Sequence, residues 1–106
     1  MATTKEYKDF ILDNLSLLDN IACKPMMGEY LLYYNHVLIG GIYDDRLLVK
    51  IVKTNQKYNM QEEIPYNNAK AMYLVDNVDN KEILKEIILD TYEELRKWNI
   101  LYYLEE

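Results

Sequence analysis

The chain has 106 residues, of which 12 are basic and 18 are acidic, so its formal net charge is −6. This length suits a single domain spanning residues 1–106, because a second compact core would have too few residues to bury. Half of the residues are hydrophobic and only 2 are Pro and 3 are Gly, which argues against a disordered chain. We expect a small, acidic, globular domain.

The cellular location is inferred from simple exclusions. Cys23 is the only cysteine, which excludes an intrachain disulfide and a multi-cysteine metal site. The polar first residues lack the basic and apolar regions of a signal peptide. No apolar stretch approaches the ~20 residues that a membrane-spanning helix needs. We therefore expect a cytoplasmic protein that does not enter a membrane.

Residues 4–18 are predicted to form an amphipathic helix. Thr3 stands three residues before Glu6, which is the spacing of a capping box at a helix start. Apolar residues then recur at steps of three and four and form one stripe that a core can bury. The stripe consists of Tyr7, Phe10, Ile11, Leu15 and Leu18.

An antiparallel meander is predicted next. Residues 21–27, 30–34, 37–43 and 46–52 are rich in Tyr, Leu, Val and Ile, which favour strands. Asn35-His36 and Asp44-Asp45 separate the later strands, and Asn and Asp tolerate the positive φ of tight hairpin turns. Gly28 allows the first turn. Pro25 cannot donate to a ladder, which places the first strand at a sheet edge. In the last strand we expect one buried face and one face at least partly wet.

The second half of the chain is predicted to contain a loop over residues 54–68 with room for a short helix, and a short strand at 71–75. Asp79 stands three residues before Glu82 and is predicted to cap a long helix that ends near Lys97. These elements describe an α+β domain. We expect a two-layer sandwich in which about five antiparallel strands carry both helices on one face, leaving the other face for solvent or association.

No catalytic, metal or cofactor site is predicted, and we do not expect an enzyme. His36 is the only histidine and is placed at a hairpin tip, where a turn residue is expected and not a base. One His and one Cys give no metal-ligand spacing. Gly40-Gly41 lies inside a strand and lacks the pattern of a phosphate-binding loop. Glycines in a strand mark a bulge or the close approach of a neighbouring element, and here we expect them to make room for a helix.

The charge distribution bears on the class of partner. Residues 1–58 hold seven basic and seven acidic side chains, whereas residues 59–106 hold five and eleven. An acidic chain is not expected to bind nucleic acid directly, because phosphate contacts need a basic footprint. The single basic run leaves weak nucleic-acid binding as an alternative. It consists of Arg46, Lys50, Lys53 and Lys57.

The 11 tyrosines have two open interpretations. Tyr suits half-buried positions in a core boundary, and it equally suits a protein–protein interface. The apolar tail at residues 98–106 must pack on its own sheet or on a partner. A third class of function, an enzyme or ligand-binding domain with a cleft between sheet and helices, has no supporting residue pattern.

Two stretches carry a family resemblance. Residues 24–33 read KPMMGEYLLY and residues 41–50 read GIYDDRLLVK. Together they resemble the N-terminal domain of the TfoX/Sxy competence regulators, whose first strand reads like Arg-x-Met-Phe-Gly; here Lys24 and Met27 stand at the Arg and Phe positions. Residues 65–75 are similar to the small, stand-alone members.

The resemblance implies a two-layer fold like that of secretion chaperones. It also implies a regulatory role in transcriptional control of DNA-uptake competence, exerted through a protein partner or a second copy in a possible homodimer. The resemblance points to Lys24, Met26, Met27, Gly28 and Tyr30 as interaction residues. The composition of the tail adds Trp98, Tyr102 and Tyr103 as an apolar patch.

Overall fold

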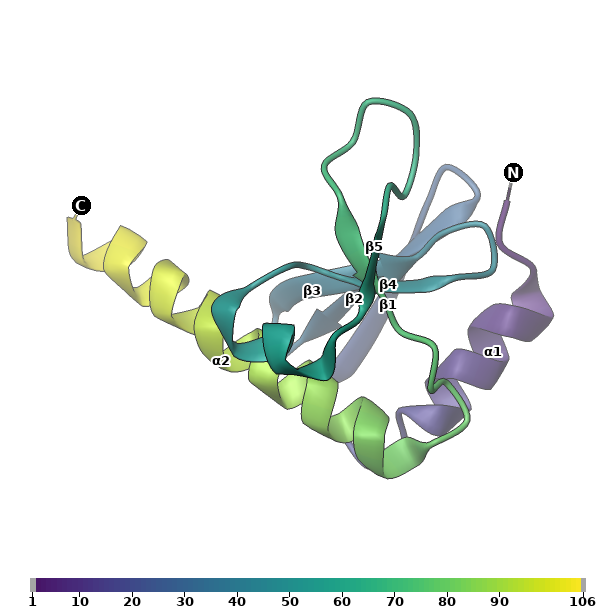
Figure 1. The fold of residues 1–106 in the computed structure, drawn as a ribbon, viewed down its shortest axis with the longest axis horizontal. Helices are drawn as coiled ribbons and strands as arrows, with labels where there is room; N and C mark the ends of the chain where they lie inside the picture. The colour runs from purple at the N-terminus through teal and green to yellow at the C-terminus, as the bar shows by residue number, and fades with distance from the viewer. Residues whose placement is uncertain (1, 106) are drawn as a thin grey trace.

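A computed structural model describes the backbone of residues 2–105 and the side chains of residues 2–97. Figure 1 shows its elements. They are α1 (Lys5–Asn14), β1 (Ile21–Met26), β2 (Glu29–Tyr34), β3 (Val37–Ile42), β4 (Leu47–Val49), the 3₁₀ helix η1 (Lys53–Tyr58), β5 (Gln61–Glu63), β6 (Met72–Leu74) and α2 (Lys81–Glu105). The predicted α+β class is confirmed. The antiparallel sheet has six strands where about five were expected, in the order β1-β2-β3-β4-β6-β5.

Three consecutive hairpins build the first four strands. Their two-residue turns are Met27-Gly28, Asn35-His36 and Asp44-Asp45, and all six residues have a positive φ between 48° and 86°. Two positive φ values are what a type I′ turn requires, and its twist matches that of the flanking strands. The predicted turn positions are confirmed. So is the edge position of β1, the strand that contains Pro25.

Both helices pack on one face of the sheet, as predicted. Ile11 of α1 and Ile88 of α2 are fully buried in the same core as Leu32, Ile39 and Leu47 of the sheet. In Figure 1, α2 crosses one side of the sheet with α1 beside it. Among the residues that the structure describes, no helix is long and apolar enough to cross a membrane.

Each helix is capped one residue later than predicted. Thr4, and not Thr3, caps α1, and Asn80, and not Asp79, caps α2. In both cases the cap side chain accepts a hydrogen bond of 3.1 Å from the backbone N–H three residues later. A side-chain oxygen in that position satisfies one of the unpaired donors of the first turn.

The helix ends also differ from expectation. The α1 helix ends at Asn14 and not at residue 18, although Leu15 and Leu18 are still buried beyond it. Phe10, assigned to the buried stripe, is 42% exposed. The α2 helix continues through Glu105 instead of ending near residue 97. The predicted patch of Trp98, Tyr102 and Tyr103 lies outside the residues whose side chains are described.

Glycines in β3 allow close approach of a strand and a ring, and not of a helix as expected. A Cβ on Gly40 would lie 2.1 Å from the carbonyl oxygen of Leu48 in β4. A Cβ on Gly41 would lie 2.7 Å from the ring of Tyr43. Neither position can accept a side chain without movement of its neighbour.

The sheet face opposite the helices is more covered than predicted. All three residues of β4 are fully buried, including Leu48, which was expected on a partly wet face. The segment predicted as a loop contains both η1 and the strand β5. The β5–β6 connection, residues 64–71, stands up from the sheet in Figure 1 and lies along this second face.

Candidate functional site

A cleft lies on the sheet face opposite the helices. Its volume is about 670 Å³. The sheet contributes apolar side chains to it, among them Met26, Leu31 and Leu38, and the β5–β6 connection contributes Pro65 and Tyr66. This volume is within the range of clefts that enclose small ligands. A smaller hollow of about 360 Å³ lies between the first turns of α2 and the part of the sheet where Gln61 begins β5 and Leu74 ends β6.

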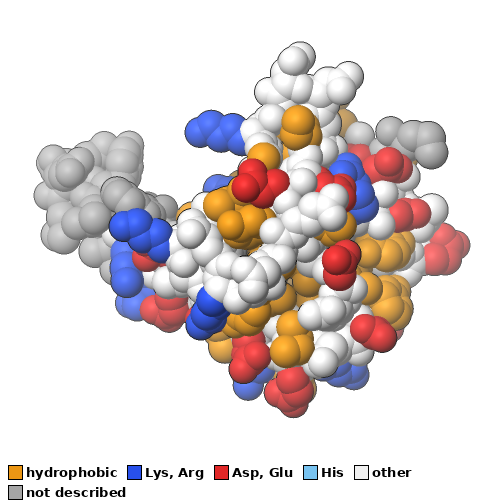
Figure 2. Space-filling model, viewed as in Figure 1, with side chains coloured by type: hydrophobic (Ala, Val, Ile, Leu, Met, Phe, Trp, Pro, Cys, Tyr) orange, Lys and Arg blue, Asp and Glu red, His pale blue; other side chains and the backbone are white. Residues whose placement is uncertain are grey.

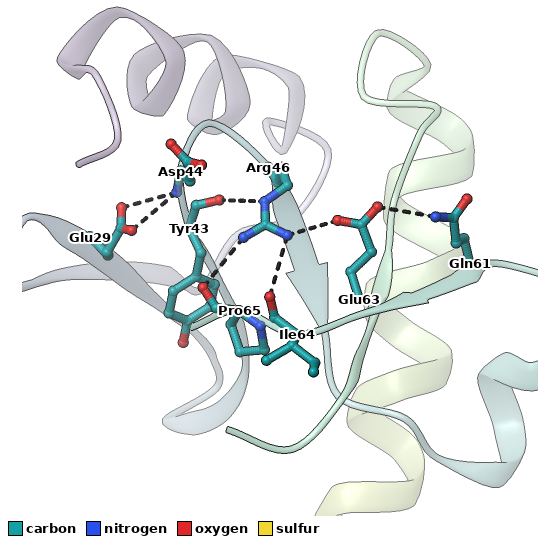
Figure 3. Close-up of polar contacts among 8 residues, drawn as sticks. All are labelled: Glu29, Tyr43, Asp44, Arg46, Gln61, Glu63, Ile64 and Pro65. Atoms are coloured by element: carbon teal, nitrogen blue, oxygen red, sulfur yellow. Dashed lines mark hydrogen bonds and ion pairs between the residues drawn. The ribbon is translucent and has the colours of Figure 1, made fainter. Parts of the chain in front are cut away.

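The β5–β6 connection, residues 64–71, forms one wall of this cleft. Arg46 holds this wall in place (Figure 3). Its Nε donates to the carbonyl oxygen of Tyr43 at 3.1 Å, and its Nη1 donates to Glu63 Oε1 at 2.7 Å. The same guanidinium reaches the carbonyl oxygens of Ile64 at 3.4 Å and Pro65 at 3.3 Å. The planar fork of Arg makes several directed hydrogen bonds at once. Arg46 therefore ties the end of β5 and the start of the wall to the β3–β4 turn.

Glu29 fixes the same turn from the other side. Its two carboxylate oxygens each accept a hydrogen bond of 3.1 Å from the backbone N–H of Asp44 (Figure 3). The carboxylate also accepts from the Thr3 backbone N–H at 2.9 Å and from the Thr3 hydroxyl at 2.7 Å. The Thr4 backbone N–H donates to Asp45 at 2.8 Å. The N-terminal segment and the β3–β4 turn are thus held as one unit beside the cleft.

Two tyrosines stand at this end of the cleft. Tyr43 is buried, and its ring centroid lies 6.1 Å from that of Tyr66 with 52° between the ring planes. Burial raises the pKa of the Tyr43 phenol, and the neighbouring Tyr66 and Glu29 add to this effect. On the wall, Tyr66 is 58% exposed and Ile64 is 56% exposed. The wall therefore presents apolar surface to solvent as well as to the cleft.

The charged side chains of the cleft are both lysines. Lys50 follows β4 and Lys70 belongs to the wall, and both line the cleft. Burial lowers the pKa of the Lys50 ammonium, because desolvation disfavours its charged form. Within residues 2–97 no carboxylate forms an ion pair with Lys50 or Lys70. Lys24 also belongs to this face of the sheet, with its ammonium 5.0 Å from the centroid of the Tyr33 ring.

The five interaction residues taken from the resemblance do not form one surface. Lys24 and Met26 lie on the cleft face, and Met26 lines the cleft. Met27 and Gly28 form the β1–β2 turn, with Met27 99% exposed. Tyr30 lies on the opposite face and packs against the helix-side core. Alternation along β1 and β2 separates these residues, because successive side chains of a strand point to opposite faces.

The predicted basic run is also divided. Arg46 is engaged with the β5–β6 connection, and Lys57 forms an ion pair of 3.0 Å with Asp90 on α2. Lys50 lines the cleft, whereas Lys53 is exposed on η1. Two of the four positive charges are therefore compensated locally, and the four side chains serve different parts of the fold.

A buried polar cluster positions the segment that carries Lys50. The fully buried Asn55 amide donates to the carbonyl oxygen of Lys50 at 2.8 Å and to the Thr91 hydroxyl at 2.9 Å. Its oxygen accepts from the Val52 backbone N–H at 3.2 Å. The Thr91 hydroxyl donates to the Ile87 carbonyl oxygen at 2.7 Å. This cluster joins η1 and the end of β4 to α2.

Sequence reasoning missed the cleft. Of its lining, Met26 was named only through the resemblance and Lys50 only in the basic run, and the leucines of the sheet were assigned only to strands. Most of its wall lay in a segment predicted as a loop. The apolar run Ile64-Pro65-Tyr66 in that polar segment was the available signal. Cys23 packs against the core, and burial raises the pKa of its thiol. Among the described side chains, no group of three or more His, Cys, Asp or Glu is arranged to hold a metal ion.

Comparison with known proteins identifies a relative of this chain. No protein-family model matches the chain. The "uncharacterized 12.7 kDa protein in trpE 5′region" of Spirochaeta aurantia is 31% identical over 80 residues, which cover 74% of this chain and 70% of the relative. The chain belongs to the family of this spirochaete protein. No function is established for that relative, so the family assignment by itself gives no activity.

Proposed function

We propose that this chain is a small regulatory domain of the TfoX N-terminal type, which acts by binding and not by catalysis. The position of the cleft carries this proposal. The three stretches of the resemblance, residues 24–33, 41–50 and 65–75, each contribute residues to its lining. Segments that are separate in the sequence thus meet at one surface feature, which is typical of a shared binding site.

The chemistry of the lining supports binding. The described residues that line the cleft are mostly apolar, and they include neither a carboxylate nor an imidazole beside Lys50. The titratable side chains of the described lining are lysines and tyrosines, and no hydrogen bond joins two of them in the way that orients a catalytic acid or base. A preformed apolar cleft with a few polar groups is instead typical of a ligand or partner site.

The regulatory role is tested by deleting the gene in the organism that carries it and measuring all transcripts and DNA uptake. We expect a restricted set of transcripts to change, including those of DNA-uptake genes. Wild-type protein should restore them, and Ala71→Phe, which fills the cleft, should not. Ser16→Phe adds the same ring at an exposed position outside the cleft and should restore them.

Two outcomes separate the parts of this proposal. Unchanged transcripts in the deletion strain would overturn the regulatory role. A changed set of transcripts without DNA-uptake genes would support a regulatory role and exclude a role in competence. Circular dichroism and thermal melting of both variants show whether each folds, so a folding defect is not read as loss of binding.

A second copy of the chain is the first partner to test, because the tail composition suits association. Light scattering across a concentration series gives the absolute mass of the wild type. If the tail makes a dimer, the double variant Tyr102→Ala and Tyr103→Ala should have the mass of one chain at concentrations where the wild type has the mass of two. A wild-type mass of one chain throughout would assign regulation to a different protein partner.

A further inference from the structure

We infer that the cleft binds a small amphipathic anion, a molecule with an apolar body and one carboxylate or similar acidic head. The inference goes beyond the regulatory proposal and does not depend on it, because it uses only the geometry and charge of the cleft. The size, the lining and the charge of the cleft each point to this class of ligand.

Size and lining define the apolar body. A volume of about 670 Å³ suits a molecule of drug-like size and is too small for a folded partner. Leu31 and Leu38 of the sheet face Pro65 and Tyr66 of the wall across it. Burial of an aliphatic or aromatic body against these side chains is favourable by about 25 cal/mol for each Å² removed from water. Strongly hydrated polyanions would lose their water here without compensating partners.

Charge defines the head. The chain carries a net charge of −6, and Figure 2 shows acidic side chains spread over the viewed face between hydrophobic patches. Against that background, the described lining of the cleft contains two lysines and no acid. A ligand anion would give Lys50 the partner that no carboxylate within residues 2–97 supplies. Charge-assisted hydrogen bonds of this kind are roughly twice as strong as neutral ones.

The same arrangement disfavours other ligands of equal size. A neutral molecule with the same apolar body would desolvate Lys50 further and offer it at most an uncharged acceptor, which is a weaker partner than an anion. A cation would be repelled by both lysines. The backbone of Lys50 is fixed beside the cleft. Its carbonyl oxygen accepts a hydrogen bond from Asn55, and its N–H donates a hydrogen bond of 2.9 Å to the Ile39 carbonyl oxygen.

The test uses three probes with one apolar chain and different heads: octanoate, octanol and octylammonium. Each is titrated into ¹⁵N-labelled protein while amide shifts are recorded. We expect octanoate to shift the amides of Leu31, Leu38, Ile51 and residues 66–72 saturably. Octanol should bind about tenfold more weakly, and octylammonium should cause no saturable shift of these amides.

Charge variants locate the head. Lys50→Met keeps an unbranched apolar chain and removes the charge, so octanoate should bind it about tenfold more weakly while octanol binds at least as well as before. Lys70→Met should weaken octanoate binding less, because Lys70 is exposed. Lys81→Met removes one exposed charge on α2 away from the cleft and should change nothing.

Four results would overturn the inference. They are equal affinity for octanoate and octanol, unchanged octanoate affinity in both Lys50→Met and Lys70→Met, shifts centred outside the cleft, and no shift at millimolar octanoate. Each can occur while the transcript test of the regulatory role still succeeds, so the two proposals fail separately.

Discussion

The side chain of Asn55 is fully buried, and its amide forms hydrogen bonds to three residues: Lys50 and Val52 in the stretch that leaves β4, and Thr91 on α2. The bond to Lys50 joins η1 to the chain that leaves β4, and the bond to Thr91 joins it to α2. Buried polar groups left without partners cost much more than a satisfied hydrogen bond contributes. A single amide thus determines how the chain leaves β4 and meets α2.

Asn55→Ala should therefore lower the free energy of unfolding by about 3 kcal/mol, because it leaves the Lys50 carbonyl and the Val52 N–H unpaired. Urea unfolding followed by circular dichroism measures the change. Gln56→Ala, an exposed neighbour on η1, should shift stability by no more than about 0.5 kcal/mol. Equal losses in the two variants would contradict the assigned role of Asn55.

Sequence reasoning succeeded at residues that follow local rules and failed at residues with distant partners. Asn35-His36 was predictable as a turn because the tolerance of positive φ is a property of these residues themselves. Asn55 pairs with Thr91, 36 positions away, and Arg46 pairs with Glu63, 17 positions away. Arg46 looked like a surface cation because nothing near it in the sequence indicates its acidic partner.

At the scale of elements, the β5–β6 connection is held at its start by a few polar contacts. Its tip, drawn in green in Figure 1, projects from the sheet. Arg46 holds the start of the connection, through Glu63, Ile64 and Pro65. Removal of this anchor should loosen the cleft wall without unfolding the core.

Arg46→Met should speed amide hydrogen exchange in residues 64–71 severalfold while exchange in α2 stays unchanged. Arg46→Lys should give an intermediate rate, because lysine keeps the charge and loses the planar fork. Hydrogen exchange with mass spectrometry measures both. Lys53→Met, which removes an exposed charge from η1, is the matched control. Wild-type exchange in the wall of Arg46→Met would show that other contacts hold it.

The elements that sequence reasoning missed are those whose formation is decided by their neighbours. β5 consists of Gln61, Glu62 and Glu63, which have little intrinsic preference for strands, and it forms by pairing with β6. The α1 helix was predicted too long because Leu15 and Leu18 keep the helical spacing of buried residues after the helix has ended. Hydrophobic spacing reports burial more reliably than it reports the last helical turn.

At the scale of the whole molecule, several tyrosines affect stability in alkali. The Tyr58 hydroxyl donates to Asp90 at 2.5 Å, next to Lys57 and Glu86. Burial raises the pKa of Tyr58, and the bond to Asp90 raises it further. Burial also raises the pKa of Tyr7 and of Tyr43. Folding therefore favours the protonated phenol at all three positions.

Stability should fall as pH rises above the ordinary tyrosine pKa of 10.0, because the unfolded chain then loses phenol protons that the folded chain retains. Below that pH the stabilisation that comes from these raised tyrosine pKa values is fully present. The urea midpoint, measured from neutral pH into alkali, checks the direction. Tyr58→Phe should be less stable at neutral pH and should lose less stability in alkali. A steeper alkaline loss in Tyr58→Phe than in the wild type would contradict the assignment.

The arrangement of layers was predictable because it follows from combining local patterns. Successive hairpins between two amphipathic helices leave few ways to bury both helices, and packing them on one sheet face is the simplest. The position of the cleft did not follow, because it depends on how residues 64–71 fold back over the opposite face. That placement depends on Arg46 and on the unexpected strand β5.

The two outer strands of the sheet have a consequence for how copies of this protein coexist at high concentration. β1 presents Pro25, which has no N–H to offer an incoming strand, and β5 is three residues long with two glutamates. Short, charged or proline-containing borders block the strand addition from which fibrils grow. Growth of a continuous sheet from one copy to the next is thus disfavoured at both ends.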